Sequence, residues 1–257
     1  MPKTFVQYSK VYDILYKDKD YDSECAFLRR IFKKYSRRPV NDVLDVACGT
    51  GNHILPLAKC GFSISAQDIS CYMLKIAKYK AGKAKLNIKF SSGSRPMQDF
   101  RHDKKFDAVI AMFASVGYVT NHQDLKRAFV NIRNCLREGG VFTFDFWNKD
   151  AVKKYFLPHK EKVFIDGDSK VCRVSDTVLD NRNSLAKIKY LCTYFEGGKK
   201  KKAINELHRM KYYTQGELSQ ILEDSGFKVL DSFPFMRIGK IITGKDWNIS
   251  IVATPKN

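Results

Sequence analysis

The stretch that decides the fold is VLDVACGTGNH, residues 43–53, in which an apolar run ends at a turn with two glycines. Such a run is typical of a buried strand, and the segment after the turn has the pattern of a helix. In open α/β sheets, a glycine-bearing turn of this kind is where nucleotide-like ligands bind. Because Gly49 and Gly51 carry no Cβ, the main chain can approach such a ligand closely.

The residues around this turn limit which ligand it can hold. A dinucleotide fingerprint would have a third glycine where Ile54 stands, and the Gly-Lys-Ser/Thr of a P-loop is also absent. NAD, FAD and nucleoside triphosphates are therefore disfavoured. The carboxylate of Asp45 would repel a pyrophosphate but tolerate a cation. The turn favours S-adenosylmethionine, which carries a sulfonium and an ammonium group.

A second acid stands at the spacing expected for a ribose contact. Asp68 follows the next apolar run, about 20 residues beyond the turn, where a carboxylate reaches the ribose hydroxyls of a bound nucleoside. The alternative is that Asp45 and Asp68 only cap helices.

The alternation of strand and helix extends from residue 41 to about residue 147. Further apolar runs lie at 63–67, 88–90, 106–112 and 141–146, and amphipathic segments lie around 52–60, 70–82 and 122–137. The glycines of Glu138-Gly139-Gly140 would stop the last of these helices. This alternation predicts a parallel sheet with helices on its faces.

The flanking segments have different patterns. Residues 1–40 are polar and helical in pattern, with Tyr8, Tyr12 and Tyr16 on one face, a stripe more typical of core packing than of chemistry. An antiparallel insert is predicted by strand-like segments without intervening helices, at 161–165, 170–178, 185–196 and 203–213. The chain then continues with a helix that starts at Thr214, with Glu217 as capping-box partner, and with two runs at 227–233 and 248–254.

Composition places the protein among globular chains. Hydrophobic residues make up 44% and aromatic residues 13% of the 257, which excludes a disordered or low-complexity chain. The apolar stretches are far shorter than the roughly 20 residues of a membrane span, and the start lacks a signal-peptide pattern. Seven cysteines without a Cys-x-x-Cys pair argue against disulfides and against a metal site. We expect a soluble, cytoplasmic protein with no membrane partner.

The net charge is strongly positive. Lys and Arg number 46 against 27 Asp and Glu, a formal charge of +19 that attracts nucleic acids, membrane surfaces or phosphorylated small molecules. The charge alone does not choose among these anions. The dense lysine run at 199–202 follows two glycines, and we expect it at a solvated hairpin tip.

Four segments resemble one enzyme family. Residues 44–51, LDVACGTG, look like motif I of the class I S-adenosylmethionine-dependent methyltransferases, and the other similar segments are 98–100, 106–110 and 136–142. The resemblance implies a Rossmann-like α/β fold with a seven-stranded, mostly parallel sheet, helices on both faces, and an antiparallel β insert that covers the active site. It implies a helical lid at 1–40, a cofactor-binding core at 41–155 and 214–257, and the insert at 156–213.

Within this family the chain is most similar to small-molecule methyltransferases that dimethylate nucleotide-linked amino sugars, at 11–16, 112–118, 146–147, 173–175 and 207–208. The resemblance implies methyl transfer from S-adenosylmethionine to a small, anionic acceptor, with an amine as the expected group and S-adenosylhomocysteine as product. The implied cofactor contacts are Tyr16, Tyr21, Asp45, Ala47, Gly49, Gly51, Asp68, Ile69, Met73, Met97, Gln98 and Met112. The implied acceptor contacts are Glu24, Tyr118, Trp147, Arg173 and His208.

Methyl transfer is an in-line displacement, so the enzyme mainly aligns the two reactants. Our candidate base is His208, with Tyr16 or Tyr118 as positioning groups. The alternative for His208 is a structural role. Arg173 would either clasp a substrate phosphate with its fork of donors or pair with an acid such as Asp176 on the sheet surface, and we favour the pairing. The other histidines have the pattern of surface or helix residues: His53, His102, His122 and His159.

One segment departs from the family pattern. Residues 93–97 lack the usual Gly-Asp pair, so the adenine amino group would meet a main-chain carbonyl or Asp99.

Two other functions stay open. A nucleic-acid methyltransferase would use the positive charge, but the expected Asn/Asp-Pro-Pro-Tyr/Phe tetrapeptide is replaced by Met112-Phe113-Ala114-Ser115. A non-catalytic binding protein could keep the fold, although the intact turn with its two acids argues against that. The sequence does not fix the oligomeric state, and a homodimer is compatible with it.

Overall fold

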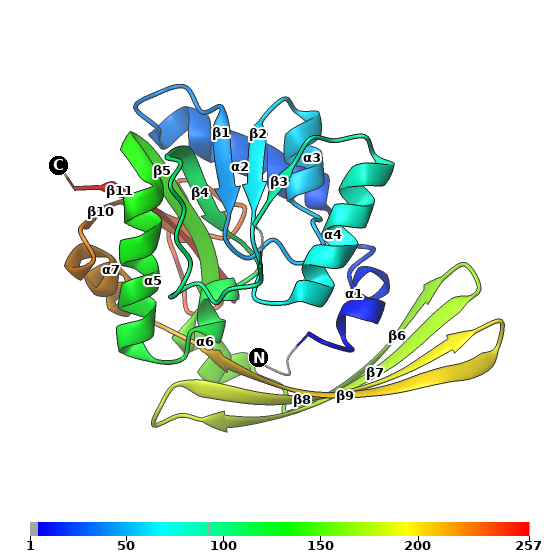
Figure 1. The fold of residues 1–257 in the computed structure, drawn as a ribbon. Coiled ribbons are helices and arrows are strands. Elements are labelled where there is room, and N and C mark those ends of the chain that lie inside the picture. Colours follow the sequence, from blue (N-terminus) through cyan, green and yellow to red (C-terminus); the bar gives the residue numbers. More distant parts are fainter. Residues whose placement is uncertain (1–4, 92, 257) are drawn as a thin grey trace.

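The computed structural model describes residues 5–91 and 93–256, which form two sheets (Figure 1). The larger sheet has seven strands in the order β10-β11-β5-β4-β1-β2-β3, and the smaller has four in the order β6-β7-β8-β9. The strands of the larger sheet are β1 (Asp42–Asp45), β2 (Ser63–Ala66), β3 (Lys89–Phe90), β4 (Phe106–Ala111), β5 (Leu136–Trp147), β10 (Phe227–Pro234) and β11 (Asn248–Pro255).

Parallel pairing dominates the larger sheet. Strand β1 pairs in parallel with both β2 and β4, and the pairs β2–β3 and β4–β5 are parallel as well. Strand β11 runs antiparallel to β5 and to β10. Every residue of the central strand β4 is buried, which explains its almost continuous apolar run. The prediction of a seven-stranded, mostly parallel, Rossmann-like sheet is confirmed.

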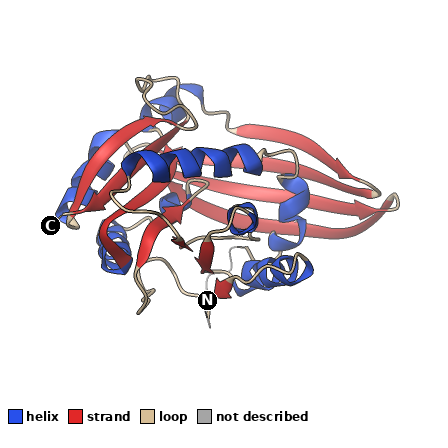
Figure 2. Cartoon of the chain, turned by 90° about the horizontal axis from the view of Figure 1, so that it is seen from above, coloured by secondary structure: helices blue, strands red, loops and turns tan. Residues whose placement is uncertain are grey.

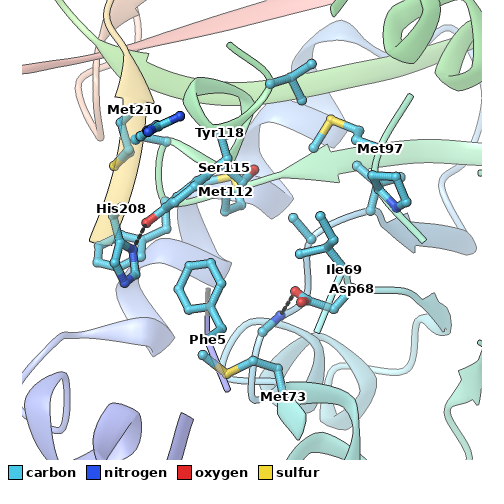
Figure 3. Close-up of a pocket in the computed structure, with 18 of the residues that line it drawn as sticks. Phe5, Asp68, Ile69, Met73, Met97, Met112, Ser115, Tyr118, His208 and Met210 are labelled. Carbon is cyan, nitrogen blue, oxygen red and sulfur yellow. Dashed lines mark hydrogen bonds between the residues drawn. The ribbon is translucent and has the colours of Figure 1, made fainter. Parts of the chain in front are cut away.

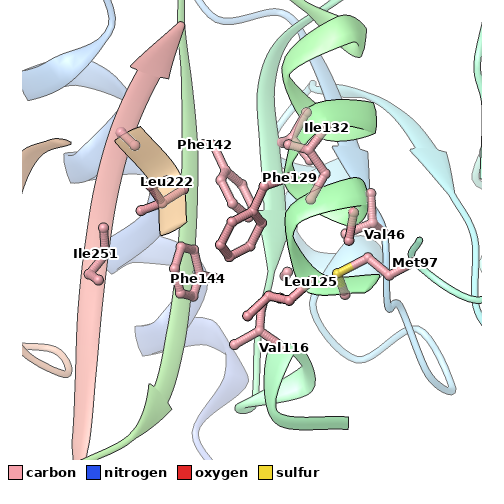
Figure 4. Packing of buried hydrophobic residues seen from close by; sticks show 14 of the residues in the cluster. Val46, Met97, Val116, Leu125, Phe129, Ile132, Phe142, Phe144, Leu222 and Ile251 are labelled. Carbon is pink, nitrogen blue, oxygen red and sulfur yellow. The ribbon is translucent and has the colours of Figure 1, made fainter. Parts of the chain in front are cut away.

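Helices cover both faces of this sheet (Figure 2). On one face, Phe129 of α5 and Leu222 of α7 pack in one cluster with Phe142 of β5 (Figure 4). On the other face, Leu28 of α2 packs in a second cluster with Ile110 of β4. In the part of the chain that the structure describes, no helix is both long and apolar enough to cross a membrane. The covering helices are α2 (Tyr21–Tyr35), α3 (Ile54–Lys59), α4 (Cys71–Lys83), α5 (His122–Cys135) and α7 (Gln215–Asp224).

Two helix boundaries test the capping signals in the sequence. The side chain of Thr214 accepts from the main-chain N–H of Glu217, whose carboxylate accepts in return from Thr214, so the predicted capping box of α7 is confirmed. The helix predicted at 122–137 ends earlier, at Cys135, because β5 begins at the next residue. The glycines at 138–140 therefore lie inside a strand, and the prediction that they stop the helix was wrong.

Gly140 is required by the close approach of β4 and β5. A Cβ at this position would lie 2.8 Å from the carbonyl oxygen of Asp107 and 3.0 Å from that of Arg137. We expect Gly140→Ala to lower the free energy of unfolding by about 1–3 kcal/mol, because these main-chain atoms are held by the sheet. Urea denaturation measures this change. The control is Gly216→Ala in α7, where a Cβ meets open space and should be neutral or stabilising. Equal stability of the two variants would contradict the argument.

The smaller sheet is an antiparallel meander of β6 (His159–Asp166), β7 (Ser169–Asp180), β8 (Leu185–Glu196) and β9 (Lys199–Lys211). Its strands confirm the predicted antiparallel insert. The glycines Gly167, Gly197 and Gly198 all have positive φ at the hairpin turns. The lysines at 199–202 were predicted at the hairpin tip, but Gly197 and Gly198 form the tip and the lysines begin β9.

The N-terminal segment, residues 5–16, bridges the two sheets. Its helix α1 (Ser9–Leu15) packs on the smaller sheet, where Val11 shares a cluster with Ile204. On the side of the larger sheet, the Asp13 carboxylate accepts from Oγ1 of Thr50 at 2.6 Å and from Nζ of Lys80 at 2.9 Å. Two short helices remain, the 3₁₀ helix η1 (Ser115–Tyr118) and α6 (Lys149–Tyr155).

Candidate active site

A cavity of about 740 Å³ opens at the carboxyl ends of β1, β2 and β4 (Figure 3). This edge of an open parallel sheet is where such folds bind ligands. The larger sheet, the N-terminal segment and the smaller sheet all contribute to the walls. The lining residues include Ala47, Gly49, Asp68, Ile69, Met73, Met97, Gln98 and Met112 from the core, Phe5, Tyr8, Tyr12 and Tyr16 from the N-terminal segment, and Tyr190, His208 and Met210 from the smaller sheet.

The predicted glycine turn and the predicted ribose acid are joined by a hydrogen bond. The main-chain N–H of Gly49 donates to Oδ2 of Asp68 over 2.8 Å. Gly49 and Gly51 have φ values of +55° and +93°, which favour glycine. A Cβ on Gly49 would meet nothing within 4 Å, whereas a Cβ on Gly51 would lie 3.3 Å from the Cβ of Ala77 in α4. Gly49 therefore leaves space beside the cavity, and Gly51 lets α4 approach the turn.

Neither acid is a helix N-cap, so that alternative was wrong. The N-cap of α4 is Ser70, whose hydroxyl accepts from the main chain of Met73, and α3 has no side-chain cap. Asp68 lines the cavity, and its Oδ1 accepts from the N–H of Ser70 at 2.8 Å. Asp45 is buried, does not line the cavity, and accepts from the N–H of Ala47 at 3.0 Å.

Burial makes both carboxyl groups weaker acids than usual. It raises the pKa of Asp45 to about 7 and that of Asp68 to about 6, although hydrogen bonds from main-chain N–H groups oppose the shift at both residues. Near neutral pH a fraction of each group is therefore protonated. A ligand that presents a cation or hydroxyl groups would favour the ionised forms.

The position of Asp99 bears on which group would contact the adenine amino group. This residue lies outside the cavity, and its carboxylate is 3.8 Å from Nη2 of Arg127. The neighbouring residues Met97 and Gln98 do line the cavity. The two options for the adenine amino group, a main-chain carbonyl and Asp99, stay predictions, and Asp99 does not belong to the lining.

The tyrosine stripe of the N-terminal segment faces the cavity as well as the core. Tyr8 stacks on Tyr190, with ring centroids 5.2 Å apart, and its hydroxyl lies 3.3 Å from that of Tyr16. Arg173 donates to both hydroxyls, at 3.1 Å to Tyr8 and 3.4 Å to Tyr16. The predicted pairing of Arg173 with Asp176 was therefore wrong, and Arg173 touches the cavity wall only through the tyrosines.

Tyr118 and His208 meet on the wall opposite Asp68 and Ile69 (Figure 3). The hydroxyl of Tyr118 is 2.9 Å from Nδ1 of His208. The imidazole is 1% exposed and also packs edge-on against the ring of Phe5, at 4.9 Å between centroids. The structure thus brings the candidate base and one of its candidate positioning groups into direct contact.

Several predicted site residues lie outside the cavity lining, namely Tyr21, Glu24, Asp45, Gly51 and Arg173. Glu24 forms a buried pair with Nε2 of His53 at 2.6 Å and also contacts Lys19, so it does not face the cavity. Burial lowers the pKa of His53 to about 4. The prediction of His53 as a surface or helix residue was wrong, whereas His102, His122 and His159 are exposed.

Sequence reasoning missed a strained turn between β4 and η1. Phe113 and Ala114 line the cavity with φ values of +64° and +53°, which are rare outside glycine. Oδ2 of the buried Asp145 fixes this turn by accepting from the N–H of Ala114 at 3.0 Å, and it also accepts from Nδ2 of Asn248 at 2.7 Å. No signal in the sequence marks two consecutive non-glycine residues for this conformation.

The comparisons with known proteins agree with this geometry. Residues 43–140 match a family model described as a methyltransferase domain. The sequence is 29% identical to the dTDP-3-amino-3,4,6-trideoxy-alpha-D-glucopyranose N,N-dimethyltransferase of Streptomyces venezuelae, over 87% of this chain and 91% of that one. A putative methyltransferase of Geobacillus sp. (strain WCH70) is 29% identical, over 89% of this chain and 90% of its own. The chain is an enzyme with a methyltransferase domain.

Solved structures share the fold of the methyltransferase. An S-adenosylmethionine-dependent methyltransferase from Clostridium acetobutylicum ATCC 824 superposes with a TM-score of 0.84, at 22% identity over 98% of both chains. DesVI from Streptomyces venezuelae gives a TM-score of 0.81, at 24% identity over 97% of this chain and 99% of that one. The predicted enzyme class is confirmed. The solved structure from Clostridium acetobutylicum is named as that of an S-adenosylmethionine-dependent enzyme, in agreement with the predicted cofactor.

The residues at the turn fit this cofactor. Gly49 leaves open space at the cavity edge, and the carboxylate of Asp68 stands beside it. Pockets of about 300–1,000 Å³ typically hold one drug-sized ligand. At about 740 Å³, the cavity has room for a nucleoside and part of a second reactant.

Binding of S-adenosylhomocysteine to the methyltransferase should weaken as the pH falls. The ammonium and ribose hydroxyls of the ligand favour ionised carboxylates, so below the pKa values of about 7 for Asp45 and about 6 for Asp68 binding must first remove protons. From about pH 7.5 to about pH 5.5 the Kd should rise by about tenfold or more. Titration calorimetry in two buffers of different ionisation enthalpy measures both the Kd and the released protons. A constant Kd over this range would show that the ligand does not stabilise the ionised form of either carboxylate, whether by contact with Asp68 or through the field of Asp45.

Proposed function

We propose that the methyltransferase transfers a methyl group to the amino group of a nucleotide-linked amino sugar. The observation that carries this proposal is the match to the Streptomyces venezuelae N,N-dimethyltransferase over 87% of this chain and 91% of that one. Relatives from Streptomyces fradiae and Saccharopolyspora spinosa are also named as N,N-dimethyltransferases of dTDP-linked amino sugars. The positive charge of the chain suits the anionic nucleotide part of such a substrate.

We assign the cofactor to the part of the cavity formed by the core strands. Asp68 would accept hydrogen bonds from the ribose hydroxyls, and Gly49 would lie against the methionyl part. Support comes from the Gly49–Asp68 hydrogen bond at the cavity edge. The other proposed cofactor contacts are Ile69, Met97, Gln98, Met112, Met73, Ala47 and Tyr16. Tyr21, Asp45 and Gly51 lie outside the lining and would act through the packing, charge and shape around the turn.

We assign the acceptor to the opposite part of the cavity. Trp147 and Tyr118 line it there, and His208 stands directly behind the Tyr118 hydroxyl. An amine must lose its proton before its lone pair can attack, and the His208–Tyr118 pair supplies a group that can take it. Arg173 and Glu24 do not line the cavity, so their proposed roles are indirect. Arg173 would hold Tyr16 in place through its hydrogen bond, and Glu24 would hold His53 through their buried pair.

In the proposed reaction the main task of the enzyme is to align the acceptor nitrogen with the methyl group of the cofactor. The bound cofactor supplies an activated methyl group; the acceptor nitrogen bonds to it as the carbon–sulfur bond breaks, and one proton leaves the nitrogen. The rings of Tyr8, Tyr12 and Tyr16 line the cavity, where they exclude water and favour a cationic sulfur through their π faces. The enzyme thus orients the two reactants and holds the proton acceptor.

A direct assay tests this function. The purified enzyme is incubated with S-adenosylmethionine and a dTDP-linked 3-amino-3-deoxy sugar, and added methyl groups are followed by mass spectrometry. We expect one or two methyl groups on the amine. The same nucleotide sugar with a hydroxyl in place of the amine is the control and should stay unmodified. Methylation of RNA, with none of the amino sugars modified, would overturn the proposal in favour of a nucleic-acid substrate.

The comparisons do not favour the nucleic-acid alternative, since the relatives named above act on small molecules. We also propose a cytoplasmic location, which suits the unpaired cysteines and the supply of nucleotide sugars. The homodimer compatible with the sequence stays a prediction, and sedimentation analysis of the purified chain checks it.

A further inference from the structure

Glu206 on β9 is a buried acid that the roles assigned above do not use. Its side chain lies on the inner face of the smaller sheet and is 6% exposed. Its carboxylate accepts from three main-chain N–H groups of the N-terminal segment, those of Phe5 and Gln7 at 2.7 Å and that of Tyr8 at 2.9 Å. Three donors to one carboxylate hold it in place and favour its ionised form.

The same carboxylate stands beside the candidate base. Oε2 of Glu206 is 3.4 Å from Nε2 of His208, a buried nitrogen without a hydrogen-bond partner among the described residues. The other ring nitrogen, Nδ1, lies 2.9 Å from the hydroxyl of Tyr118. The three side chains form a line that runs from the cavity wall to the anchored carboxylate. Contacts of this kind are often loose before substrate binds and shorten in the reactive complex.

The position of the acid selects a tautomer of the imidazole. Burial opposes ionisation of Glu206, but the neighbouring imidazole of His208 and hydrogen bonds from the main chain hold the pKa of Glu206 below the ordinary value. An ionised carboxylate at 3.4 Å favours a hydrogen on the Nε2 atom that faces it. Nδ1 is then the acceptor, so the hydroxyl of Tyr118 donates to it. The oxygen lone pairs of Tyr118 are left facing the cavity that this residue lines.

We propose that Glu206 is a positioning residue that fixes the Nε2–H tautomer of His208 and so makes the Tyr118 oxygen the group that takes the proton of the acceptor. This inference rests on the proposed function. As the carbon–nitrogen bond forms and the carbon–sulfur bond breaks, a proton leaves the nitrogen for the Tyr118 oxygen. The phenolic hydrogen passes to Nδ1, and the resulting imidazolium lies next to the Glu206 carboxylate. Tyr118 is thus the catalytic residue in contact with the acceptor, and His208 receives the proton from it.

The tautomer can be measured without any acceptor. Nitrogen-15 NMR of the complex with S-adenosylhomocysteine distinguishes the two ring nitrogens of His208, whose signals are assigned with His208→Asn. We expect Nε2–H in the wild-type protein and a mixture of tautomers in Glu206→Gln. Nδ1–H in the wild type would overturn the proposal, even if the variant fails to fold. So would an unchanged tautomer in a folded Glu206→Gln.

A kinetic measurement separates positioning from a purely structural role. The titratable groups that face the His208 ring are Tyr118 from η1, Tyr8 from the N-terminal segment, Tyr190 from β8 and Glu206 from β9. Loss of the only anion among them makes the imidazolium harder to form, so in Glu206→Gln the acid limb of the kcat profile should move down by about one pH unit. The maximal kcat should fall about tenfold, with the KM for S-adenosylmethionine unchanged.

The matched control is Glu196→Gln at the exposed end of β8, where the carboxylate pairs with Lys201, and its pH profile should match that of the wild type. If Glu206→Gln raises KM but leaves kcat and its pH profile unchanged, Glu206 only anchors the N-terminal segment, and the proposal is overturned. If no amine is methylated by the wild type, the proposed function fails, and the NMR result still decides the tautomer.

Discussion

Asp68→Ala should weaken binding of S-adenosylmethionine by about 1.5–3 kcal/mol, which is about 10- to 150-fold in Kd. The expected loss comes from charge-assisted hydrogen bonds between the carboxylate and the ribose hydroxyls, and alanine offers no acceptor in their place. Asp68 also accepts from the N–H of Gly49 at 2.8 Å, so the variant loosens the turn itself. Titration calorimetry with S-adenosylhomocysteine gives the Kd, and thermal unfolding of the free protein shows whether the fold persists.

The natural control is Asp99→Ala. Asp99 belongs to the segment that resembles the family's adenine side, but it lies outside the cavity and pairs with Arg127 at the surface. Its replacement should leave the Kd unchanged. If Asp68→Ala binds the cofactor as tightly as the wild type, the assignment of the ribose to this carboxylate is wrong.

His208→Ala should lower kcat by about 100-fold while the affinity for S-adenosylhomocysteine stays the same, since general acid–base catalysis typically contributes about 10²–10⁴ in rate and His208 is the final proton acceptor. The imidazole stands 2.9 Å behind the Tyr118 hydroxyl, on the wall opposite the cofactor acid (Figure 3). Single-turnover kinetics with the amino-sugar substrate measures the chemical step, and calorimetry measures the affinity.

The matched control is His159→Ala on β6 of the same sheet. His159 is exposed and pairs with Asp176 at 2.6 Å, away from the cavity lining, so its loss should not change the rate. A reduced cofactor affinity in His208→Ala, with an unchanged rate per bound complex, would instead place His208 in the scaffold or the cofactor pocket.

The parts of the fold that the sequence predicts are those set by local chemistry. The glycines at 49 and 51 adopt positive φ, and the acid at 68 hydrogen-bonds to the turn that precedes it. The buried strands appear as apolar runs because helices cover both faces of the sheet. The insert is predictable because its strands alternate between turns marked by Gly167 and by Gly197-Gly198.

The remaining parts depend on contacts between distant segments, which a single sequence does not contain. Glu24 pairs with His53 across 29 positions of the chain, and Arg173 donates to Tyr8 across 165. Such partners are chosen by the packing of α1 and α2, not by local spacing. The anchoring of residues 5–8 by Glu206 is of the same kind, and for that reason the line of three side chains behind the cavity emerges only from the structure.

Two sets of hydrogen bonds hold the N-terminal segment, residues 5–16, against the rest of the protein. Asp13 hydrogen-bonds to Thr50 and Lys80, and Glu206 holds the beginning of the segment on β9. Tyr8, Tyr12 and Tyr16 of the same segment form a wall of the cavity. Movement of this wall away from the cavity would break at least one of these two sets of hydrogen bonds. Release at the Glu206 end would take three main-chain N–H donors from the carboxylate, which stays beside His208 because both residues belong to β9.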